Sequence, residues 1–379
     1  MTSLYLLLIF GSTTIFAGET DKLISVVVLF RHGDRAPTDR VSNISWMSYF
    51  PNGLGELTDR GIENSFRLGK YLRDRYVSSG FLRVPLLPSQ VYFRSRGNNR
   101  CLMSASLIAS AMFGSIDRPT EAAVPVYSQE GKDLLLGGTS DCVAEVKRMK
   151  AVCGKTPKSH YENFTEFHGV VYECLQLHKK SKIFPNGKSF EIADSLINEH
   201  KNGLPMPDWF HEHKEEFYRS LYKVENFMLG SGEYHNPDIL RIKSGLLLHT
   251  VLNMFKSNWE KFLTHGSLEK KKFVAFSTQD WLIHSFMDAL GIRAAALGET
   301  GYPPYNTLVI LELRKINDVP VIKAYYRDPL TETLNDVTSS IRGCGSYSAC
   351  PLKDVLNCCG QYITSDKEEE CHPKKSTQR

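Results

Sequence analysis

The chain has 379 residues, of which 42% are hydrophobic, and its formal net charge is +4. This composition allows a large buried core and indicates a globular protein, made either of one large domain with an insertion or of two domains. The basic residues do not gather into a stripe, and the short run at 270–272 is typical of a solvated surface, so we predict no nucleic-acid partner.

The first 18 residues are typical of a secretory signal peptide, with an apolar stretch from Leu4 to Phe10 and small residues at Ala17 and Gly18. No later apolar run reaches the roughly 18 residues that a membrane span requires, so we expect an exported protein without a membrane anchor. Nine cysteines and the N-glycosylation acceptors Asn43 and Asn163 fit an oxidising, extracellular setting. Since there is no Cys-x-x-Cys, we predict no metal and no cofactor.

The first predicted strand is Leu23–Phe30, an almost continuous apolar run of the kind that a sheet covered on both faces contains. It ends abruptly in the charged segment 31–37, which reads Arg-His-Gly-Asp-Arg-Ala-Pro. Ligands of open α/β sheets bind outside the carboxyl ends of the strands, which is where this segment would lie. Its two arginines suit an oxyanion such as phosphate, and its histidine suits acid, base or nucleophilic chemistry.

The later elements repeat this pattern of a strand that ends in polar residues and is followed by a helix. Thr58 caps a predicted helix that ends near Tyr76. The remaining predictions are a strand at 90–93 with a helix at 102–113, a strand at 272–276 with a helix at 281–290 that stops at Gly291, and a hairpin of 308–313 and 319–326 joined by a loop at 314–318. Three strand ends should therefore converge at one edge of the sheet.

Between about residues 140 and 244 the pattern changes to charged helical segments such as Trp209–Met228, which indicates a helical insertion. We therefore predict an α/β fold with a mixed central sheet flanked by helices and an inserted, mainly α-helical cap domain. The predicted boundaries are a signal peptide at 1–18, an α/β domain at 19–140 and 245–379, and the cap at 141–244.

The segment 31–37 resembles the signature R-H-G-x-R-x-P of the histidine acid phosphatases, a family that includes prostatic and lysosomal acid phosphatases. Segments 57–61 and 68–76 resemble the family's first helix, and segments 93–95 and 100–105 resemble its second phosphate-binding segment. Segments 301–305 and 344–352 resemble its C-terminal third. The resemblance extends from about Lys22 to Cys371 and is weakest between Gly114 and Asn236.

The resemblance implies a role for five residues. His32 would be the nucleophile that forms a transient phosphohistidine, Asp280 would protonate the leaving oxygen, and the phosphate would be bound by Arg31, Arg35 and Arg94. It also implies disulfides between Cys344 and Cys350 and between Cys142 and Cys371. The other five cysteines, which leave at least one thiol unpaired, are Cys101, Cys153, Cys174, Cys358 and Cys359.

The chain departs from the family at the site. Gln279 stands where the family has a histidine, which replaces a cationic donor by a neutral amide. Arg96 and Gly97 stand where the family has Thr-Asp, and Trp281 replaces a small polar residue. Trp281 could face the core or the pocket, and with Asp280 it would then suit an amine by cation–π attraction and ion pairing. His284, one turn beyond Asp280, is a weaker candidate for replacing the lost imidazole.

These observations support two functions. We favour an acid phosphatase-like protein of impaired or lost activity, whose pocket binds a small amphipathic ligand such as a biogenic amine or a lipid mediator carboxylate. In this reading Gln279 and Trp281 are ligand-binding residues beside the arginines. The alternative is an active secreted acid phosphomonoesterase that acts through His32 on a phosphomonoester. The sequence leaves open whether the protein is a monomer or a homodimer.

Overall fold

The computed structural model describes residues 21–114, 123–138, 142–153, 189–298 and 301–373. Their strands form one eight-stranded sheet in the order β3-β2-β4-β1-β5-β6-β7, with β8 paired to β6. The strands are β1 (Asp21–Arg31), β2 (Val91–Ser95), β3 (Val126–Tyr127), β4 (Phe273–Thr278), β5 (Leu308–Ile316), β6 (Val319–Arg327), β7 (Leu334–Asp336) and β8 (Cys350–Pro351). The helices are α1 (Asp59–Tyr76), α2 (Asn99–Phe113), α3 (Val143–Cys153), α5 (Ser189–Lys201), α6 (Asp208–Leu229), α7 (Pro237–His265), α8 (Asp280–Leu290), α9 (Arg293–Leu297), α10 (Leu352–Cys358) and α11 (Lys367–Cys371).

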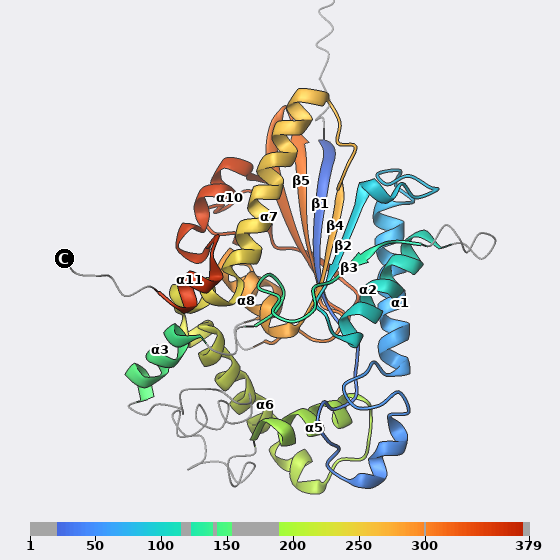
Figure 1. Ribbon diagram of the computed structural model, residues 1–379, viewed down its shortest axis with the longest axis vertical. Coiled ribbons are helices and arrows are strands. Elements are labelled where there is room, and N and C mark those ends of the chain that lie inside the picture. The colour runs from blue at the N-terminus through green and yellow to red at the C-terminus, as the bar shows by residue number, and fades with distance from the viewer. Residues whose placement is uncertain (1–20, 115–122, 139–141, 154–188, 299–300, 374–379) are drawn as a thin grey trace, which may run out of the picture.

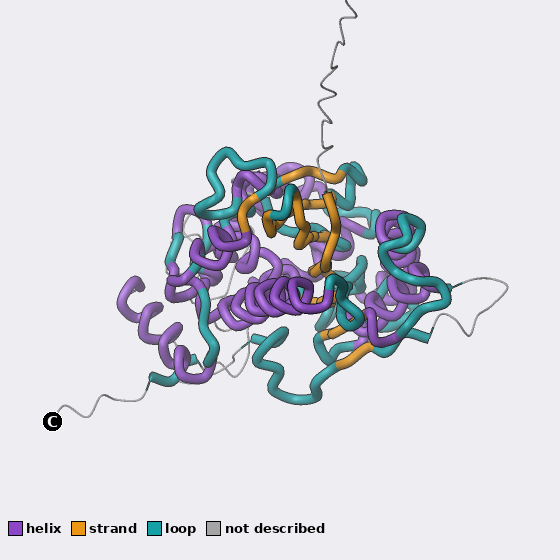
Figure 2. Tube along the Cα trace, turned by 90° about the horizontal axis from the view of Figure 1, so that it is seen from above, coloured by secondary structure: helices purple, strands orange, loops and turns teal. Residues whose placement is uncertain are grey.

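The sheet is mixed, because β1 pairs in parallel with β4 and antiparallel with β5. Its two faces are both covered: Val26 and Val28 of β1 pack toward α1 and α2, whereas Val27 and Leu29 pack toward α7 and α8. Figures 1 and 2 show the strands enclosed between these two groups of helices. The predicted fold class, an α/β fold with a mixed sheet flanked by helices, is therefore confirmed.

Local signals position most elements where the sequence predicts them. The Thr58 side chain accepts a hydrogen bond from the backbone N–H of Gly61 at the start of α1, and α8 ends at Gly291, which adopts φ +98°. The predicted hairpin loop at 314–318 was too long. Both strands continue to a two-residue turn at Asn317 and Asp318, whose positive φ values suit the right-handed twist of a hairpin.

The helices α5 and α6 lie beyond the carboxyl ends of β1, β2 and β4 (Figure 1). They carry a small core of their own, which includes Phe210, Phe217 and Val224. Helix α7 begins beside them and runs back along the sheet, so it passes through the boundary predicted at residue 244. The inserted cap is plausible on this arrangement, and its division at 141–244 stays a prediction.

Two disulfides match the pairs that the sequence predicts, Cys142–Cys371 and Cys344–Cys350. Cys358 and Cys359 form a third, between neighbours in the chain, and Cys174 lies outside the described residues. Cys101 is a free thiol inside the core, where burial raises its pKa to about 12.

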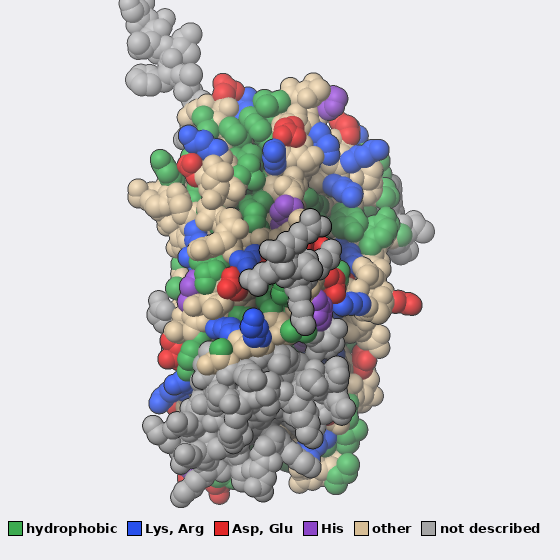
Figure 3. Space-filling view, turned by 60° about the vertical axis from the view of Figure 1, so that its left-hand side comes forward, with side chains coloured by type: hydrophobic (Ala, Val, Ile, Leu, Met, Phe, Trp, Pro, Cys, Tyr) green, Lys and Arg blue, Asp and Glu red, His purple; other side chains and the backbone are tan. Residues whose placement is uncertain are grey.

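The described part of the surface in Figure 3 mixes Lys and Arg with Asp and Glu side chains. Among the described residues, no helix has both the length and the apolar character that crossing a membrane demands.

Candidate active site

Three strand ends meet at one edge of the sheet, as the sequence predicts. Arg31 at the end of β1 lies opposite Thr278 of β4, and Ser95 at the end of β2 lies opposite Ser277. Beyond the strands, the His32 N–H still donates to the Thr278 carbonyl at 3.2 Å. The same geometry holds the Arg96 N–H at 3.0 Å from the Ser277 carbonyl. Chain segments far apart in sequence thus present their polar side chains to one cavity.

Gly33 and Gly61 allow the segment after His32 to pack directly on the start of α1. A Cβ atom at Gly33 would lie 2.4 Å from the Gly61 carbonyl oxygen, and one at Gly61 would lie 2.0 Å from that of Asp34. No side chain fits at either position without moving backbone. This close approach fixes the path of the chain that carries His32 and Arg35.

The imidazole of His32 is buried at the cavity and neutral. It is 2% exposed, and burial, followed by the charges of Arg31, Arg100 and Arg35, lowers its pKa well below the usual value. Its Nδ1 lies 2.9 Å from the Gly33 carbonyl oxygen. A carbonyl only accepts, so Nδ1 carries the proton of the neutral ring and Nε2 keeps a free lone pair.

Arg31, the neighbour of His32 in the chain, pairs with the candidate acid Asp280. Its guanidinium donates to the Pro303 carbonyl at 2.7 Å and forms an ion pair with Oδ2 of Asp280. The guanidinium also lies 4.0 Å from the centre of the Tyr305 ring, which stacks against it. Asp280 is the first residue of α8, where the helix dipole favours a negative charge.

Arg35 is oriented by the cap helix α5. Both oxygens of Asp194 accept hydrogen bonds from its guanidinium, at 2.6 and 3.1 Å. Burial raises the pKa of Asp194, but Arg35 and the hydrogen bonds from Thr38 outweigh burial, so the pKa lies below its ordinary value. A bidentate, buried pair of this kind fixes the plane of the guanidinium.

The structure corrects the predicted role of Arg94. Its guanidinium donates to Asp133 at 2.9 Å, and Arg94 is not among the described residues that line the cavity. The chain turns away after Ser95, and Asn98 caps α2, so Arg100 in the first turn of that helix reaches the cavity wall instead. Burial, and then the charge of Arg35, lowers the pKa of Arg100 from its usual value. Arg35 and Arg100 both line the cavity.

The three departures from the family at Gln279, Arg96 and Trp281 form one interacting group. The Gln279 carbonyl oxygen accepts from the Arg96 guanidinium and, at 2.8 Å, from the indole N–H of Trp281. With its oxygen engaged twice, Gln279 can offer a ligand only its amide N–H₂ group. Trp281 packs on the core and lines the cavity as well, so both alternatives for this residue hold in part.

His284 does not replace the missing imidazole. It is fully buried in α8 behind Tyr302, with 5.2 Å between the ring centres, and it is not among the described lining residues. Burial, followed by Arg293, lowers its pKa to about 3, so the ring is neutral. His284 shares a helix face with Asp280 but lies one turn further along α8, where Tyr302 packs between it and the cavity.

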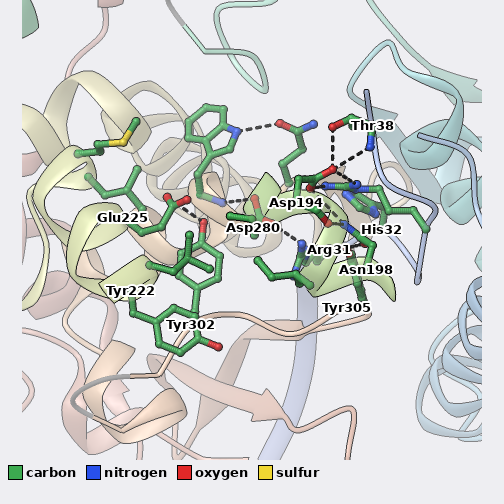
Figure 4. Close-up of a pocket in the computed structure, with 18 of the residues that line it drawn as sticks. Arg31, His32, Thr38, Asp194, Asn198, Tyr222, Glu225, Asp280, Tyr302 and Tyr305 are labelled. Atoms are coloured by element: carbon green, nitrogen blue, oxygen red, sulfur yellow. Dashed lines mark hydrogen bonds and ion pairs between the residues drawn. The ribbon is translucent and has the colours of Figure 1, made fainter. Parts of the chain in front are cut away.

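The residues converge on one cavity of about 560 Å³. Figure 4 shows His32, Arg31 and Asp194 at one end, Tyr222, Glu225 and Tyr302 at the other, and Asp280 between them. Both the α/β core and the cap supply walls, so the cavity lies at their junction.

Sequence reasoning assigned no role to several lining residues, namely Thr38, Arg100, Asp194, Asn198, Lys201, Tyr222, Glu225, Tyr302 and Tyr305. A signal existed for two groups of them. Arg100 and the tyrosines at 302 and 305 lie inside segments that resemble the family. The residues of α5 recur at helical spacing, at 194, 198 and 201, and so share one face.

The family assignment follows from this fold and site. Residues 22–327 match the model of the histidine phosphatase superfamily (branch 2), so the chain belongs to that family. It is 36% identical to "Putative acid phosphatase 1" of Caenorhabditis briggsae over 96% of this chain and 86% of that protein. It is 27% identical to human prostatic acid phosphatase, over 99% and 94% of the two chains. A phytase of Hafnia alvei, solved with myo-inositol hexakis sulphate, has the same fold, with a TM-score of 0.59 and 18% identity over 91% of this chain and 98% of that one.

Proposed function

We propose that the protein hydrolyses phosphate monoesters through a phosphohistidine formed on His32. The proposal rests on one observation: the guanidinium groups of Arg31, Arg35 and Arg100 surround the neutral imidazole of His32. Phosphoryl transfer needs positioning and stabilisation of negative charge more than covalent chemistry from the protein, and this arrangement supplies both. The acid phosphatases among the relatives agree with it.

In the first step, Nε2 of His32 attacks phosphorus as the bond to the leaving oxygen breaks, and Asp280 gives that oxygen its proton. In the second step, water attacks the phosphohistidine, Asp280 takes a proton from it, and the P–N bond breaks to release phosphate. Substrate and Asp280 compete for Arg31. A bound phosphate therefore draws Arg31 away from the Asp280 carboxyl group.

The group of Gln279, Arg96 and Trp281 supports activity rather than loss of it. A loosely held glutamine could present either its oxygen or its nitrogen to a phosphate, and the oxygen would be repelled. Hydrogen bonds from Arg96 and Trp281 to that oxygen turn the nitrogen toward the ligand. Arg96 also brings a positive charge to the position where the family has a cationic histidine. Two of the departures thus offset the third.

The direct test is turnover of p-nitrophenyl phosphate between pH 4 and 7, with an alkaline quench before mass spectrometry to detect a phosphoryl group on His32, because the P–N bond of phosphohistidine hydrolyses in acid. We expect turnover in the unmodified protein and none in His32→Ala, whereas His211→Ala, on the exposed side of α6, should behave as the unmodified protein. Absence of both turnover and a trapped phosphoryl group would contradict the proposal.

A second candidate is a binding protein for a small amphipathic ligand, either a biogenic amine or a lipid mediator carboxylate. The size of the cavity favours it, since about 560 Å³ is more than a phosphate group needs. Calorimetric titration with both classes of ligand, in protein that fails the turnover test, would support this candidate.

We also propose that the protein is exported by way of residues 1–18 and carries a glycan at Asn43, which is exposed. The disulfides at Cys142–Cys371 and Cys344–Cys350 support an oxidising destination. Mass spectrometry of the secreted protein before and after glycosidase treatment tests both points, and size-exclusion chromatography with light scattering tests the homodimer.

A further inference from the structure

The two ends of the cavity differ in charge and in character. The end around His32 has the cations Arg35, Arg96, Arg100 and Lys201. The opposite end, which we call the carboxyl–aromatic end, is lined by Glu145, Tyr222, Glu225, Lys243 and Tyr302, and Trp281 joins it to Gln279. A phosphate on His32 occupies only the first end, so the alcohol of a substrate must extend past Asp280 into the second (Figure 4).

The carboxyl–aromatic end combines two carboxyl groups with one ammonium group, that of Lys243. Glu225 of α6 is buried and accepts a hydrogen bond from the Tyr302 hydroxyl at 3.4 Å; burial, followed by Asp280, raises its pKa to about 8. Glu145 of α3 is 8% exposed, and one of its oxygens accepts from Lys243 at 2.7 Å. Its other oxygen has no hydrogen-bond partner among the described residues. Lys243 pairs with Glu145, and although Arg31 and Lys243 both lower the pKa of Glu225, burial outweighs them, so Glu225 is neutral below about pH 8 and ionised above it.

Aromatic rings provide the rest of this end. The rings of Tyr222 and Tyr302 stack with their centres 5.8 Å apart, and Trp281 forms another part of the wall. Aromatic faces beside carboxyl groups attract organic cations, because the ring quadrupole and the carboxylate both present negative potential. A second phosphate would be repelled here, and a purely apolar group would leave the Glu145 oxygen without a partner.

We propose that the carboxyl–aromatic end is a subsite for an organic ammonium group, so that the preferred substrates are phosphate monoesters of amino alcohols. The inference rests on the proposed function for its reaction, and it adds the class of alcohol. The substrate is bipolar: its phosphate lies among the arginines, and its ammonium group lies among Tyr222, Glu225, Trp281 and Tyr302.

The test compares phosphocholine with 3,3-dimethylbutyl phosphate, in which carbon replaces the quaternary nitrogen and the shape is kept. In the unmodified protein we expect kcat/KM to be at least about 10-fold higher for phosphocholine. In His32→Ala, which cannot turn either compound over, calorimetry should give a similar ratio of Kd values. Equal affinities for the two compounds would overturn the subsite.

Matched variants locate the preference. Tyr222→Leu should lower the phosphocholine preference, and Glu225→Gln should lower it above about pH 8, where that carboxyl group is ionised; both should leave binding of the carbon analogue nearly unchanged. Glu260→Gln, on an exposed face of α7, should keep the full preference. If neither compound nor p-nitrophenyl phosphate is hydrolysed, the proposed reaction is wrong. The calorimetric ratio still decides the subsite in that case, and a ratio near one overturns it.

Discussion

Asp194 holds Arg35 from a helix that lies 159 residues further along the chain, with both carboxylate oxygens on the guanidinium. The same face of α5 carries Asn198, whose side-chain oxygen accepts a hydrogen bond from the Tyr305 hydroxyl at 2.5 Å. The Tyr305 ring in turn stacks against the guanidinium of Arg31. One cap helix therefore orients two of the arginines around His32. The cap helix therefore supplies part of the candidate site and does not only cover it.

Asp194→Asn should lower kcat/KM for p-nitrophenyl phosphate on the order of 100-fold, because a misplaced guanidinium no longer matches the phosphate oxygens. Inhibition by inorganic phosphate should weaken in parallel, which a general loss of folded protein would not produce. Asp74→Asn, on the exposed side of α1, is the control. An unchanged phosphate inhibition constant would contradict the positioning role of Asp194.

Arg100 and Arg94 should differ in what they support. Arg100→Met should cost about 10²- to 10³-fold in kcat/KM, since it removes a positioned donor to developing charge. Arg94→Met breaks a buried ion pair with Asp133 and should cost about 3–5 kcal/mol of unfolding free energy, with a much smaller effect on kcat/KM of the folded fraction. Kinetics and urea denaturation of both variants check this, and the reverse pattern would restore the sequence-based role of Arg94.

The interaction between Arg96 and Gln279 predicts a non-additive pair of substitutions. Gln279→His alone places an imidazole next to Arg96, so repulsion between two cations limits the gain in kcat/KM. Gln279→His combined with Arg96→Thr should exceed either single variant, and Arg96→Thr alone should reduce activity about 10-fold by releasing the amide. A double-mutant cycle measures the coupling, which we expect to exceed about 1 kcal/mol. Additive effects would contradict the coupling.

Lys201 should set an upper pH limit for substrate binding. Burial, and then Arg31, lowers its pKa to about 8, so the ammonium is charged below that pH and neutral above it. Loss of this charge weakens attraction for the phosphate, so KM should rise above about pH 8. Lys201→Arg should keep KM low to higher pH because arginine stays protonated, whereas Lys353→Met, at an exposed site, should not alter the profile.

His32 should not add a limb of its own between pH 5 and 7. Its pKa lies well below the usual value, so the nucleophile is already neutral across that range.

The sequence predicted the framework well, because apolar runs, caps and turn residues act locally. The strand ending at Arg31, the helix capped by Thr58 and the helix stopped by Gly291 all form as expected. The hairpin loop was overestimated because the charged residues Arg314 and Lys315 suggested a turn, whereas they belong to the partly exposed end of β5.

The site was predicted less completely, because its missing members depend on contacts between distant segments. Nothing near Arg94 in sequence indicates that Asp133 takes its guanidinium, and nothing near Arg35 indicates Asp194. The departures at Gln279, Arg96 and Trp281 suggested damage when they were considered separately. In the folded chain, hydrogen bonds to the Gln279 oxygen join the three side chains into one group.

The Cys142–Cys371 bridge joins the start of the inserted region to the last described helix, across 229 residues of sequence. A protease that cuts the backbone at one point between these cysteines therefore leaves both fragments covalently attached. Without a reducing agent, such a cleaved molecule migrates as one species in electrophoresis. Its two fragments, and with them the walls of the cavity, stay joined. Only reduction before electrophoresis would reveal the cut.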